Sequence, residues 1–391
     1  MGRRRARGEL MRRTRARQVA LTGPDDSART GRRKPGKRWR SEMFERSLSN
    51  VAESADAESP SRRDLVVIGA SAGGVETLRA VVSGLPADLP AAVCVVLHIA
   101  PSSPSALATI LSRAGPMPCL PAHDGAPLRH GTILVAPPDH HLMVEDNVAR
   151  LSGGPRENGH RPSIDALFRS AAEAREAQVI GVVLSGTRDD GAAGLAAIKA
   201  SGGAAVVQDP EEAMYPGMPA NALANVAADA VVPSALIAQT LLAMVNGDAP
   251  GPGISADSGA RTEGSGEALT SVCPECGGVL TEENPAGVTQ WECHVGHRYS
   301  PRSLADAQAD RVEQAMWTAV RMLRDRSALL NQMADHAQAR QQPRSARRFR
   351  HQANDASGQA DVVLGALHEA ADNTLRSLGD TDDVVERRAT G

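Results

Sequence analysis

A serine, a histidine and an aspartate each follow an apolar segment that is typical of a buried β-strand. The three stretches are IGASAGG at residues 68–74, VVLHIAP at 95–101 and LSGTRDDGAAG at 184–194. Nucleophilic hydrolysis needs a hydroxyl, a base within hydrogen-bond reach and an acid that orients the base. Loops that follow the carboxyl ends of parallel strands converge on one crevice, so residues far apart in sequence meet there. The sequence therefore predicts a catalytic triad of Ser71, His98 and Asp190.

The surroundings of Ser71 fit a nucleophile. It stands between Gly69 and Gly73 in a G-x-S-x-G spacing, after an apolar strand and before a predicted helix. A sharp strand-to-helix turn leaves no room for side chains beside a nucleophile, and a helix start supplies backbone N–H groups for an oxyanion. We therefore expect oxyanion or substrate contacts from Ala72 and Gly73. The competing interpretation is a nucleotide-binding module in which residues 69–74 form a phosphate loop, but no Lys-Ser/Thr pair follows and the G-x-G-x-x-G pattern is not met.

The acid follows the fourth predicted strand in a glycine-flanked turn. Asp189 and Asp190 precede a predicted helix, whose N-terminal dipole favours a carboxylate. One of the two could serve only as a cap of that helix. A histidine at a strand end is usually a polar boundary residue, but three strand ends that together carry all three roles favour a catalytic use.

The elements that must position these residues alternate between strand and helix from residue 64 onward. Apolar runs predict strands and helical periodicity predicts the segments between them, with strands at 65–68, 93–97, 132–136, 179–184 and 204–208 and helices at 75–83, 105–112, 163–176, 192–201, 219–226 and 234–245. This alternation indicates right-handed crossovers and an α/β fold, a doubly wound and mostly parallel sheet with helices on both faces. Residues 141–144 and 148–151 predict a short hairpin appended to that sheet.

Composition divides the chain into six parts. The first 40 residues hold 15 Lys and Arg against 3 Asp and Glu, which predicts a disordered basic arm over residues 1–62. Nucleic acid is not an expected partner of this arm, because aromatic residues make up only 2% of the chain and base stacking needs them. The other parts are the α/β domain at 63–246, a Gly/Ser/Pro linker at 247–270, a Cys/His module at 271–300, a helical hairpin at 301–376 and a disordered tail at 377–391.

The Cys/His module has the spacing of a metal site. Cys273 and Cys276 form a C-x2-C pair, and Cys293 follows with His294 and His297 close behind. Thiolate pairs on tight turns are typical of tetrahedral zinc sites, and a segment of about 30 residues cannot bury a core alone. The predicted ligands of a structural zinc are Cys273, Cys276, Cys293 and His297, with His294 as the alternative fourth ligand. The competing interpretation is a reduced-thiol module without metal. Catalysis itself needs no cofactor, since four good ligands leave the metal no open position.

Two apolar stripes follow helical steps of three and four in the C-terminal part. The first consists of Val312, Met316, Ala319, Leu323, Leu330 and Met333, and the second of Phe349, Ala353, Ala356, Ala360, Val363 and Leu367. A break at residues 341–343 separates them. Two such helices bury their stripes against each other as an antiparallel hairpin, or against a partner. We expect the hairpin.

The sequence lacks the signals of a secreted or membrane-spanning protein. No segment approaches about 18 consecutive apolar residues, and no apolar core follows the N-terminal arginines. Cys94 lies in a predicted strand and Cys119 in a Pro-rich loop, while the other three cysteines cluster in the module, which is no disulfide framework. We therefore expect a cytoplasmic protein without membrane insertion.

Residues 64–245 resemble the catalytic domain of the chemotaxis protein-glutamate methylesterases, the CheB family. The similar motifs are IGASAGG, LHIAP, HRPSIDALF at 160–168, DDGAAG and PGMPANAL at 216–223. The resemblance implies that Ser71 is the nucleophile, that His98 is general base and then acid, and that Asp190 is the orienting acid. It implies hydrolysis of γ-glutamyl methyl esters on chemoreceptor-like proteins with release of methanol, and protein-glutamine deamidation as a further activity.

This sequence departs from the pattern of that family. Ala72 stands where Thr is common, and a Gly-Thr-Arg turn at 186–188 stands where Gly-Met-Gly is usual, so Thr187 is expected to touch the oxyanion or the substrate. Arg161 and His160, in the HRPS turn, are further candidate substrate contacts. The receiver domain that usually precedes the esterase domain is not expected here, because about 62 unpatterned residues stand in its place. Control by aspartyl phosphorylation within the same chain is therefore not expected.

The resemblance also implies partners. We expect a methylated chemoreceptor-like protein as the substrate and, through the helical tail, a protein methyltransferase or another signalling protein. One alternative to the enzyme stays open because of the altered turn at 186–188. It is a catalytically idle signalling scaffold that keeps the fold and works through the zinc module and the hairpin.

Overall fold

The computed structural model describes residues 62–103, 106–248 and 271–389, with side chains described as far as residue 370. These residues all belong to one unit of the chain, Ser59–Gly391. The predicted basic arm, up to residue 61, and the predicted linker, from residue 249, lie outside the described residues.

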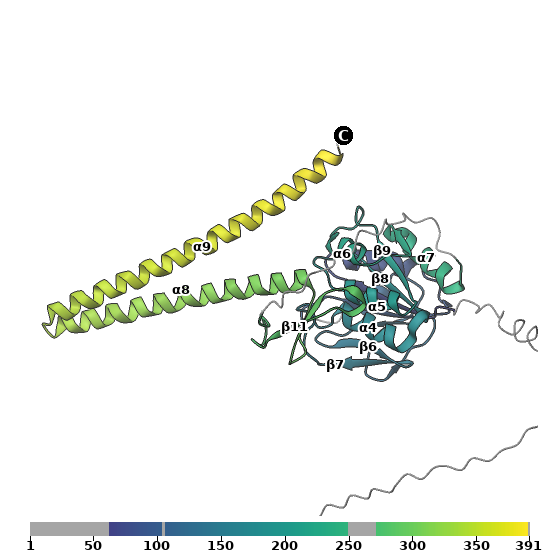
Figure 1. Cartoon of the computed structure of the whole chain (residues 1–391), viewed down its shortest axis with the longest axis horizontal. Helices are drawn as coiled ribbons and strands as arrows, with labels where there is room; N and C mark the ends of the chain where they lie inside the picture. The colour runs from purple at the N-terminus through teal and green to yellow at the C-terminus, as the bar shows by residue number, and fades with distance from the viewer. Residues whose placement is uncertain (1–61, 104–105, 249–270, 390–391) are drawn as a thin grey trace, which may run out of the picture. The chain divides into compact units, whose positions relative to one another are not determined.

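A seven-stranded parallel sheet forms the centre of the α/β domain (Figure 1). Its strand order is β10-β9-β8-β1-β2-β5-β3. The strands are β1 (Leu65–Ala70), β2 (Ala92–Leu97), β3 (Cys119–Pro121), β5 (Ile133–Val135), β8 (Val179–Val183), β9 (Ala204–Gln208) and β10 (Ala230–Val232). The chain runs from β1 to β2 on one side and places β8 on the other, so the loops after β1, β2 and β8 open into one crevice.

Side chains alternate between two apolar faces along each strand. Val66 and Ile68 pack toward α2, α3 and α7, whereas Leu65 and Val67 pack toward α4, α5 and α6. The helices are α2 (Gly74–Gly84), α3 (Leu107–Ser112), α4 (Ile164–Arg175), followed by the 3-10 turn η1 (Glu176–Gln178), α5 (Ala192–Ala200), α6 (Gly217–Asn225) and α7 (Ser234–Asn246). The predicted α/β fold with helices on both faces is confirmed.

Three short strands form a second, antiparallel sheet in the order β4-β7-β6. They are β4 (Ala126–Pro127), β6 (His141–Glu145) and β7 (Val148–Ser152). The sequence predicted the hairpin of β6 and β7 but appended it to the main sheet, and that placement was wrong because β7 pairs with β4 instead. A strand of two residues, such as β4, is too short to show an alternation of apolar and polar side chains, so the sequence could not indicate this pairing.

The Cys/His module is a small antiparallel sheet in the order β11-β12-β13. Its strands are β11 (Leu280–Glu283), β12 (Gln290–Cys293) and β13 (Arg298–Tyr299), and the 3-10 turn η2 (Pro285–Gly287) joins the first two. Val288, which follows η2, is buried in the same apolar cluster as residues of α4 and α5. The module therefore shares part of the core of the α/β domain.

Two long helices follow the module, α8 (Pro301–Ala339) and α9 (Pro343–Ala389), and the first half of α9 runs beside α8 (Figure 1). The hydroxyl of Ser327 donates to the carbonyl of Ala353, and Arg350 pairs with Asp335, which sets the two helices antiparallel. The interface consists largely of small side chains. Buried residues here are Val320, Ala334, Ala337, Ala346, Ala353, Ala356, Ala360 and Leu367.

The hairpin agrees with the sequence in topology and differs from it in detail. The antiparallel pairing and the break near residue 341 are as expected, but Val312 and Met333 of the first stripe are exposed. The predicted disordered tail at 377–391 was wrong for most of its length, because the backbone of α9 is helical to Ala389. Among the described helices, none is both long and apolar enough to cross a membrane.

Substitution of Phe168, a residue of α4, tests how tightly this helix packs on the sheet. The side chain is fully buried, and glycines on two sides make room for it: a Cβ on Gly194 would lie 2.5 Å from Cβ of Phe168, and one on Gly181 would lie 3.7 Å from its ring. We expect Phe168→Ala to lower the free energy of unfolding by about 3–5 kcal/mol, measured by urea denaturation. Met322→Ala, on the 64% exposed side chain of α8, is the control and should cost less than about 0.5 kcal/mol.

Candidate active site

The three residues predicted as a triad lie together at the crevice. The Ser71 hydroxyl is 3.1 Å from Nδ1 of His98, and Nε2 of His98 is 2.7 Å from Oδ2 of Asp190. The imidazole and the carboxylate are buried, with 6% and 1% of their side chains exposed. Both distances are those of hydrogen bonds, so a hydroxyl, an imidazole and a carboxylate form one connected series.

Close backbone packing holds the turn that carries Ser71. Its N–H donates to the carbonyl of Ser185 at 2.9 Å, and the Ser185 hydroxyl donates to the carbonyl of Ala72 at 2.9 Å. The next residue is Gly186, where a Cβ would lie 2.8 Å from Cβ of Ser71 and 2.1 Å from Sδ of Met218. Any side chain at position 186 would therefore displace either the serine or α6.

Two backbone N–H groups beside Ser71 are available to an oxyanion. Gly73 has φ of 70°, a left-handed conformation that glycine adopts at low cost, and it directs the chain into α2. The N–H of Gly74 donates to the carbonyl of Ser71, whereas those of Ala72 and Gly73 donate to no acceptor within the described ranges. They lie at the N-terminus of α2, where the helix dipole favours negative charge.

Five hydrogen bonds surround the carboxylate of Asp190. Oδ2 accepts from Nε2 of His98 and the N–H of Ile164, and Oδ1 accepts from Nδ2 of Asn158, the hydroxyl of Ser163 and the N–H of Asp165. Burial alone raises the pKa of a carboxyl group, but the hydrogen bond from His98 and the N–H of Ile164 hold the pKa of Asp190 well below its usual range. The ionised Asp190 accepts the Nε2–H of His98 and leaves Nδ1 as the acceptor for the serine proton.

A second buried carboxylate lies next to the first. Asp165 accepts the N–H groups of Gly191 and Gly194 on one oxygen and Nδ2 of Asn158 on the other. Burial and the negative charge of Asp190 raise the pKa of Asp165 well above its usual value. Asn158 donates one N–H to each carboxylate, so the side chain of this residue keeps the two acidic groups in a fixed arrangement.

Asp189 caps a helix, but not the one that follows it in sequence. Its carboxylate accepts the N–H of Arg302, at 2.9 Å, and both the N–H and the hydroxyl of Ser303, at 3.2 and 2.6 Å. It therefore caps α8 rather than α5. The partners stand more than 100 positions away in sequence, so no local pattern could have indicated this contact.

Arg161 and Thr187, predicted as substrate contacts, occupy different settings. The guanidinium of Arg161 donates to Asp139 and to the carbonyls of Gly153 and Gly154, so it holds the loop between β7 and α4. Thr187 is exposed in the loop after β8, directly after the glycine that packs against Ser71. Of the two, only Thr187 adjoins Gly186, where a Cβ would lie 2.8 Å from Cβ of Ser71.

His160 lies directly on the imidazole of the triad. The rings of His160 and His98 stack with centroids 3.7 Å apart and planes 11° apart. Burial lowers the pKa of His160 to about 3, and repulsion from His98 in its protonated form acts in the same direction. A neutral ring therefore covers one face of His98 throughout the neutral pH range and restricts its rotation.

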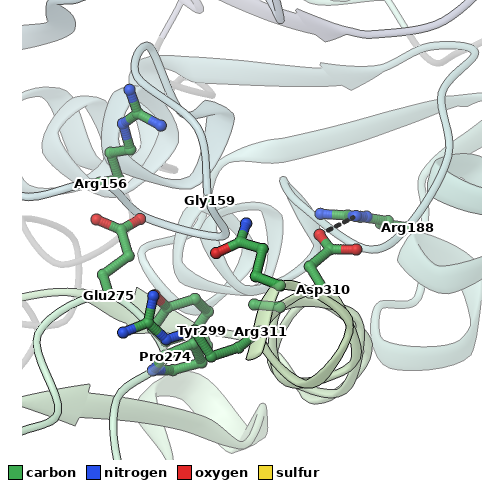
Figure 2. Close-up of a pocket in the computed structure, with 10 residues that line it drawn as sticks. Arg156, Gly159, Arg188, Pro274, Glu275, Tyr299, Asp310 and Arg311 are labelled. Carbon is green, nitrogen blue, oxygen red and sulfur yellow. Dashed lines mark ion pairs between the residues drawn. The ribbon is translucent and has the colours of Figure 1, made fainter. Parts of the chain in front are cut away.

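An open pocket of about 410 Å³ lies between the loop before His160 and the C-terminal part of the chain (Figure 2). From the α/β domain it is lined by Arg156, Gly159 and Arg188, and from the C-terminal part by Pro274, Glu275, Tyr299, Asp310 and Arg311, among others. Figure 2 shows the carboxylates of Glu275 and Asp310 pointing toward the arginines of the α/β domain. Opposite charges thus face each other across this contact.

The Cys/His module brings four potential metal ligands together. Sγ of Cys273, Cys276 and Cys293 and a ring nitrogen of His297 lie within 4.8 Å of one another. The Cys276–Cys293 sulfurs are 3.6 Å apart, and Nδ1 of His297 is 3.5 Å from Cys293 and 3.7 Å from Cys273. These are about the edge lengths of a tetrahedron with bonds of roughly 2.0–2.3 Å, as zinc requires. His294, the alternative ligand, is exposed and outside this group.

The surroundings of these ligands suit a cation. Nε2 of His297 lies 3.0 Å from Glu275, the arrangement in which a carboxylate orients a metal-binding imidazole. Burial by itself raises the pKa of Cys293, but hydrogen bonds from His297 and backbone N–H groups lower it to about 6. Cys293 therefore favours the thiolate, which is the form that binds metal, whereas burial raises the pKa of Cys273.

Comparison with known proteins identifies relatives of the α/β domain. The family model described as CheB methylesterase matches residues 66–241. A protein of Leptospira interrogans serovar copenhageni, named putative protein-glutamate methylesterase/protein-glutamine glutaminase, is 37% identical over 180 residues, which cover 46% of this chain and 93% of the relative. A protein of Anaeromyxobacter dehalogenans, named protein-glutamate methylesterase/protein-glutamine glutaminase 2, is 41% identical over 191 residues, which cover 48% of this chain and 56% of that protein.

The residues that the family model matches lie within the α/β domain. The chain spans about half the length of several of the curated relatives it matches. A solved structure, the CheB methylesterase catalytic domain of Thermotoga maritima, is 31% identical with a TM-score of 0.45, and the match covers 46% of this chain and 97% of that one.

The stacked pair of histidines gives the stability of the fold a pH dependence. The pKa of His160 is about 3 in the folded protein and about 6.5 in an unfolded chain, so the unfolded state binds more protons between these values. Stability is therefore lost as the pH falls below 6.5. We expect urea denaturation to show that the wild type loses about 1 kcal/mol more than His160→Gln between pH 7.5 and 5.5. Equal losses in the two proteins would contradict a buried neutral His160.

Proposed function

Because the chain belongs to the CheB methylesterase family, we propose that residues 63–246 form a serine hydrolase that cleaves γ-glutamyl methyl esters on chemoreceptor-like proteins. The observation that carries this proposal is the hydrogen-bonded series from Ser71 through His98 to Asp190. The names of the relatives add a glutaminase activity. Hydrolysis of a γ-glutamyl amide needs the same groups, so we propose deamidation as a second reaction of this site.

The reaction begins with proton transfer from the serine. Nδ1 of His98 takes the proton of Ser71 while Oγ attacks the ester carbonyl, and Nε2–H stays hydrogen-bonded to Asp190, which stabilises the imidazolium. The N–H groups of Ala72 and Gly73 hold the oxyanion of the tetrahedral intermediate. His98 then returns its proton to the departing methoxide, and methanol leaves.

Water completes the cycle. A water molecule attacks the acyl-enzyme while Nδ1 of His98 removes one of its protons, and the second tetrahedral intermediate forms against the same N–H groups. Its collapse breaks the bond to Oγ of Ser71, which regains the proton from His98. The products are a free glutamate side chain and the original enzyme.

We propose that Cys273, Cys276, Cys293 and His297 hold a structural zinc ion. The support is the donor set and its spacing, which match a closed tetrahedral site. Such an ion would cross-link the turns of a module that has too few apolar residues to fold by burial alone. Four protein ligands leave no position for a substrate, so the zinc ion would take no direct part in the hydrolysis.

The helical hairpin is a candidate contact for a signalling partner, either the receptor or a methyltransferase. Support comes from exposed apolar side chains along α8, namely Val312, Trp317, Met322 and Leu329. The substrate class implies that the protein works in the cytoplasm, where the methylated helices of chemoreceptors lie.

Replacement of the nucleophile tests the reaction. We expect Ser71→Ala to lower the rate of methanol release from a methylated receptor by about 10⁴-fold or more, because no other group forms the acyl-enzyme. Ser83→Ala is the matched control, since this exposed hydroxyl of α2 contacts only the carbonyl of Ala80, and it should keep wild-type activity. Wild-type methanol release by the Ser71 variant would exclude the proposed mechanism.

A fluorophosphonate probe separates the enzyme from an idle scaffold. Covalent labelling of Ser71, abolished in His98→Ala, supports an activated serine. No labelling of the wild type supports the scaffold.

Metal analysis tests the zinc site. Protein purified without chelators should contain about one zinc per chain by mass spectrometry, and Cys276→Ser and His297→Ala should lose most of it, because each removes one of four ligands. His294→Ala, at the exposed neighbouring histidine, should retain the metal. A metal-free wild type would show that the module is a reduced-thiol domain.

A further inference from the structure

The buried amide of Asn158 joins the triad to the start of α8. Its Nδ2 donates to Asp190 and to Asp165, each at 2.8 Å. Its Oδ1 accepts the N–H of Ser300 at 2.7 Å and the hydroxyl of Ser300 at 3.0 Å. Asn158 is 1% exposed and Ser300 2% exposed, so bulk water does not compete for these bonds.

Ser300 determines which way this amide points. An amide carries an acceptor oxygen on one side and two N–H donors on the other. Reversal of the group would set the oxygen of Asn158 against the carboxylates of Asp165 and Asp190. Two donors from Ser300 hold the oxygen on the opposite side and thereby direct both N–H groups toward the carboxylates. The orientation of a donor to the triad thus depends on a residue 142 positions away in sequence.

The backbone of Asn158 is held from the same direction. It has φ of 54°, in the left-handed region that non-glycine residues seldom occupy. Its N–H donates to the carbonyl of Arg298 at 2.7 Å, and the N–H of Arg298 donates to the carbonyl of Arg156. Strand β13 therefore fixes the loop that presents the amide.

Two further contacts attach the C-terminal part of the chain to acidic residues beside the amide. Asp189, the residue before the triad aspartate, caps α8 through Arg302 and Ser303. Nε2 of Gln290, a buried residue of β12, lies 3.3 Å from Oδ2 of Asp165. A buried carboxylate needs donors to remain in place, and here the C-terminal part supplies several of them.

Apolar and charged contacts surround this polar centre. Val288 is buried against the α/β domain, and Arg188 pairs with Asp306 at 3.0 Å. Arg188 also pairs with Asp310, at 3.9 Å (Figure 2). These ion pairs are partly exposed and add little stability, so the buried network carries the contact.

We propose that Ser300, acting through Asn158, is a positioning residue for Asp190, and that the C-terminal module is thereby part of the working active site. The proposal rests on the proposed hydrolase function for its kinetic readout. The geometry of Asp190 is measured independently of catalysis, by the proton resonance of the His98 Nε2–H that is bonded to it. His297, a ligand of the Cys/His cluster, stands three residues before Ser300, so the cluster holds the segment that orients the amide.

The first experiment uses Ser300→Ala in the full chain. Loss of one hydrogen bond to the amide oxygen should lower kcat for methyl ester hydrolysis about fivefold to tenfold and leave KM within twofold, because the substrate does not touch Ser300. The downfield proton resonance of the His98 Nε2–H, which is bonded to Asp190, should shift in the variant. Fluorophosphonate labelling of Ser71 should slow by the same factor as kcat.

Ser271→Ala is the matched control in the same module. Its hydroxyl accepts from Gln308 at an exposed position, away from the network, so kcat, labelling and the resonance should equal those of the wild type. Asn158→Ala should lower kcat more than Ser300→Ala does. The double variant should be no slower than Asn158→Ala alone, because Ser300 acts only through the amide.

Three results would overturn the proposal. The first is wild-type kcat with an unshifted resonance in Ser300→Ala. The second is a double variant in which the two losses multiply. The third is a loss of activity in Ser300→Ala that is matched by loss of metal and of thermal stability, since Ser300 would then only hold the module together. If the wild type neither hydrolyses esters nor labels, the proposed function fails, and the His98 resonance still decides whether Ser300 positions Asp190.

Discussion

A buried negative charge is the constraint on which this site depends. A carboxylate removed from water is costly unless donors replace its hydration, and Asp190 is surrounded by them: the imidazole, three groups at the start of α4 and one side-chain amide. These donors come from three parts of the chain: the loop after β2, the loop before α4 and the start of α4 itself. The charge therefore draws together segments that share no local sequence pattern.

Close packing and backbone hydrogen bonds hold Ser71, the proposed nucleophile. Glycine at position 186 allows the loop after β8 to approach Ser71, and Gly73 turns the chain into α2 with two N–H groups left for an oxyanion. The proposed catalytic groups follow the ends of β-strands and keep their positions because these strands are buried on both faces. Ser71 and His98 are thus fixed in different ways, Ser71 by close packing and backbone hydrogen bonds and His98 by its bond to a buried carboxylate.

Patterns of apolar residues in the sequence predicted several strands and helices, because the pattern of each such element lies within residues that are near one another in the chain. Apolar runs indicated β1, β2, β8 and β9, and the residues that follow three of them proved to lie together. The role of Asn158 had no such signal, because an asparagine in a turn is ordinary and its partners stand on α4, after β8 and before α8. The pairing of β4 with β7 was also missed, because a strand of two residues is too short to show an alternation of apolar and polar side chains. Asp189 and Asp190 were adjacent candidates, and only the fold separates one that faces the imidazole from one that caps a distant helix.

The cap at Asp189 also gives the long hairpin a mechanical meaning. Helix α8 has 39 residues and is about 58 Å long, and its first turn is bonded to the residue beside the triad aspartate. A rigid rod clamped at one end converts a tilt of a few degrees at the clamp into a displacement of several ångströms at its tip. A protein that binds the far end of α8 would therefore act, through this cap, on the loop that carries Asp189 and Asp190.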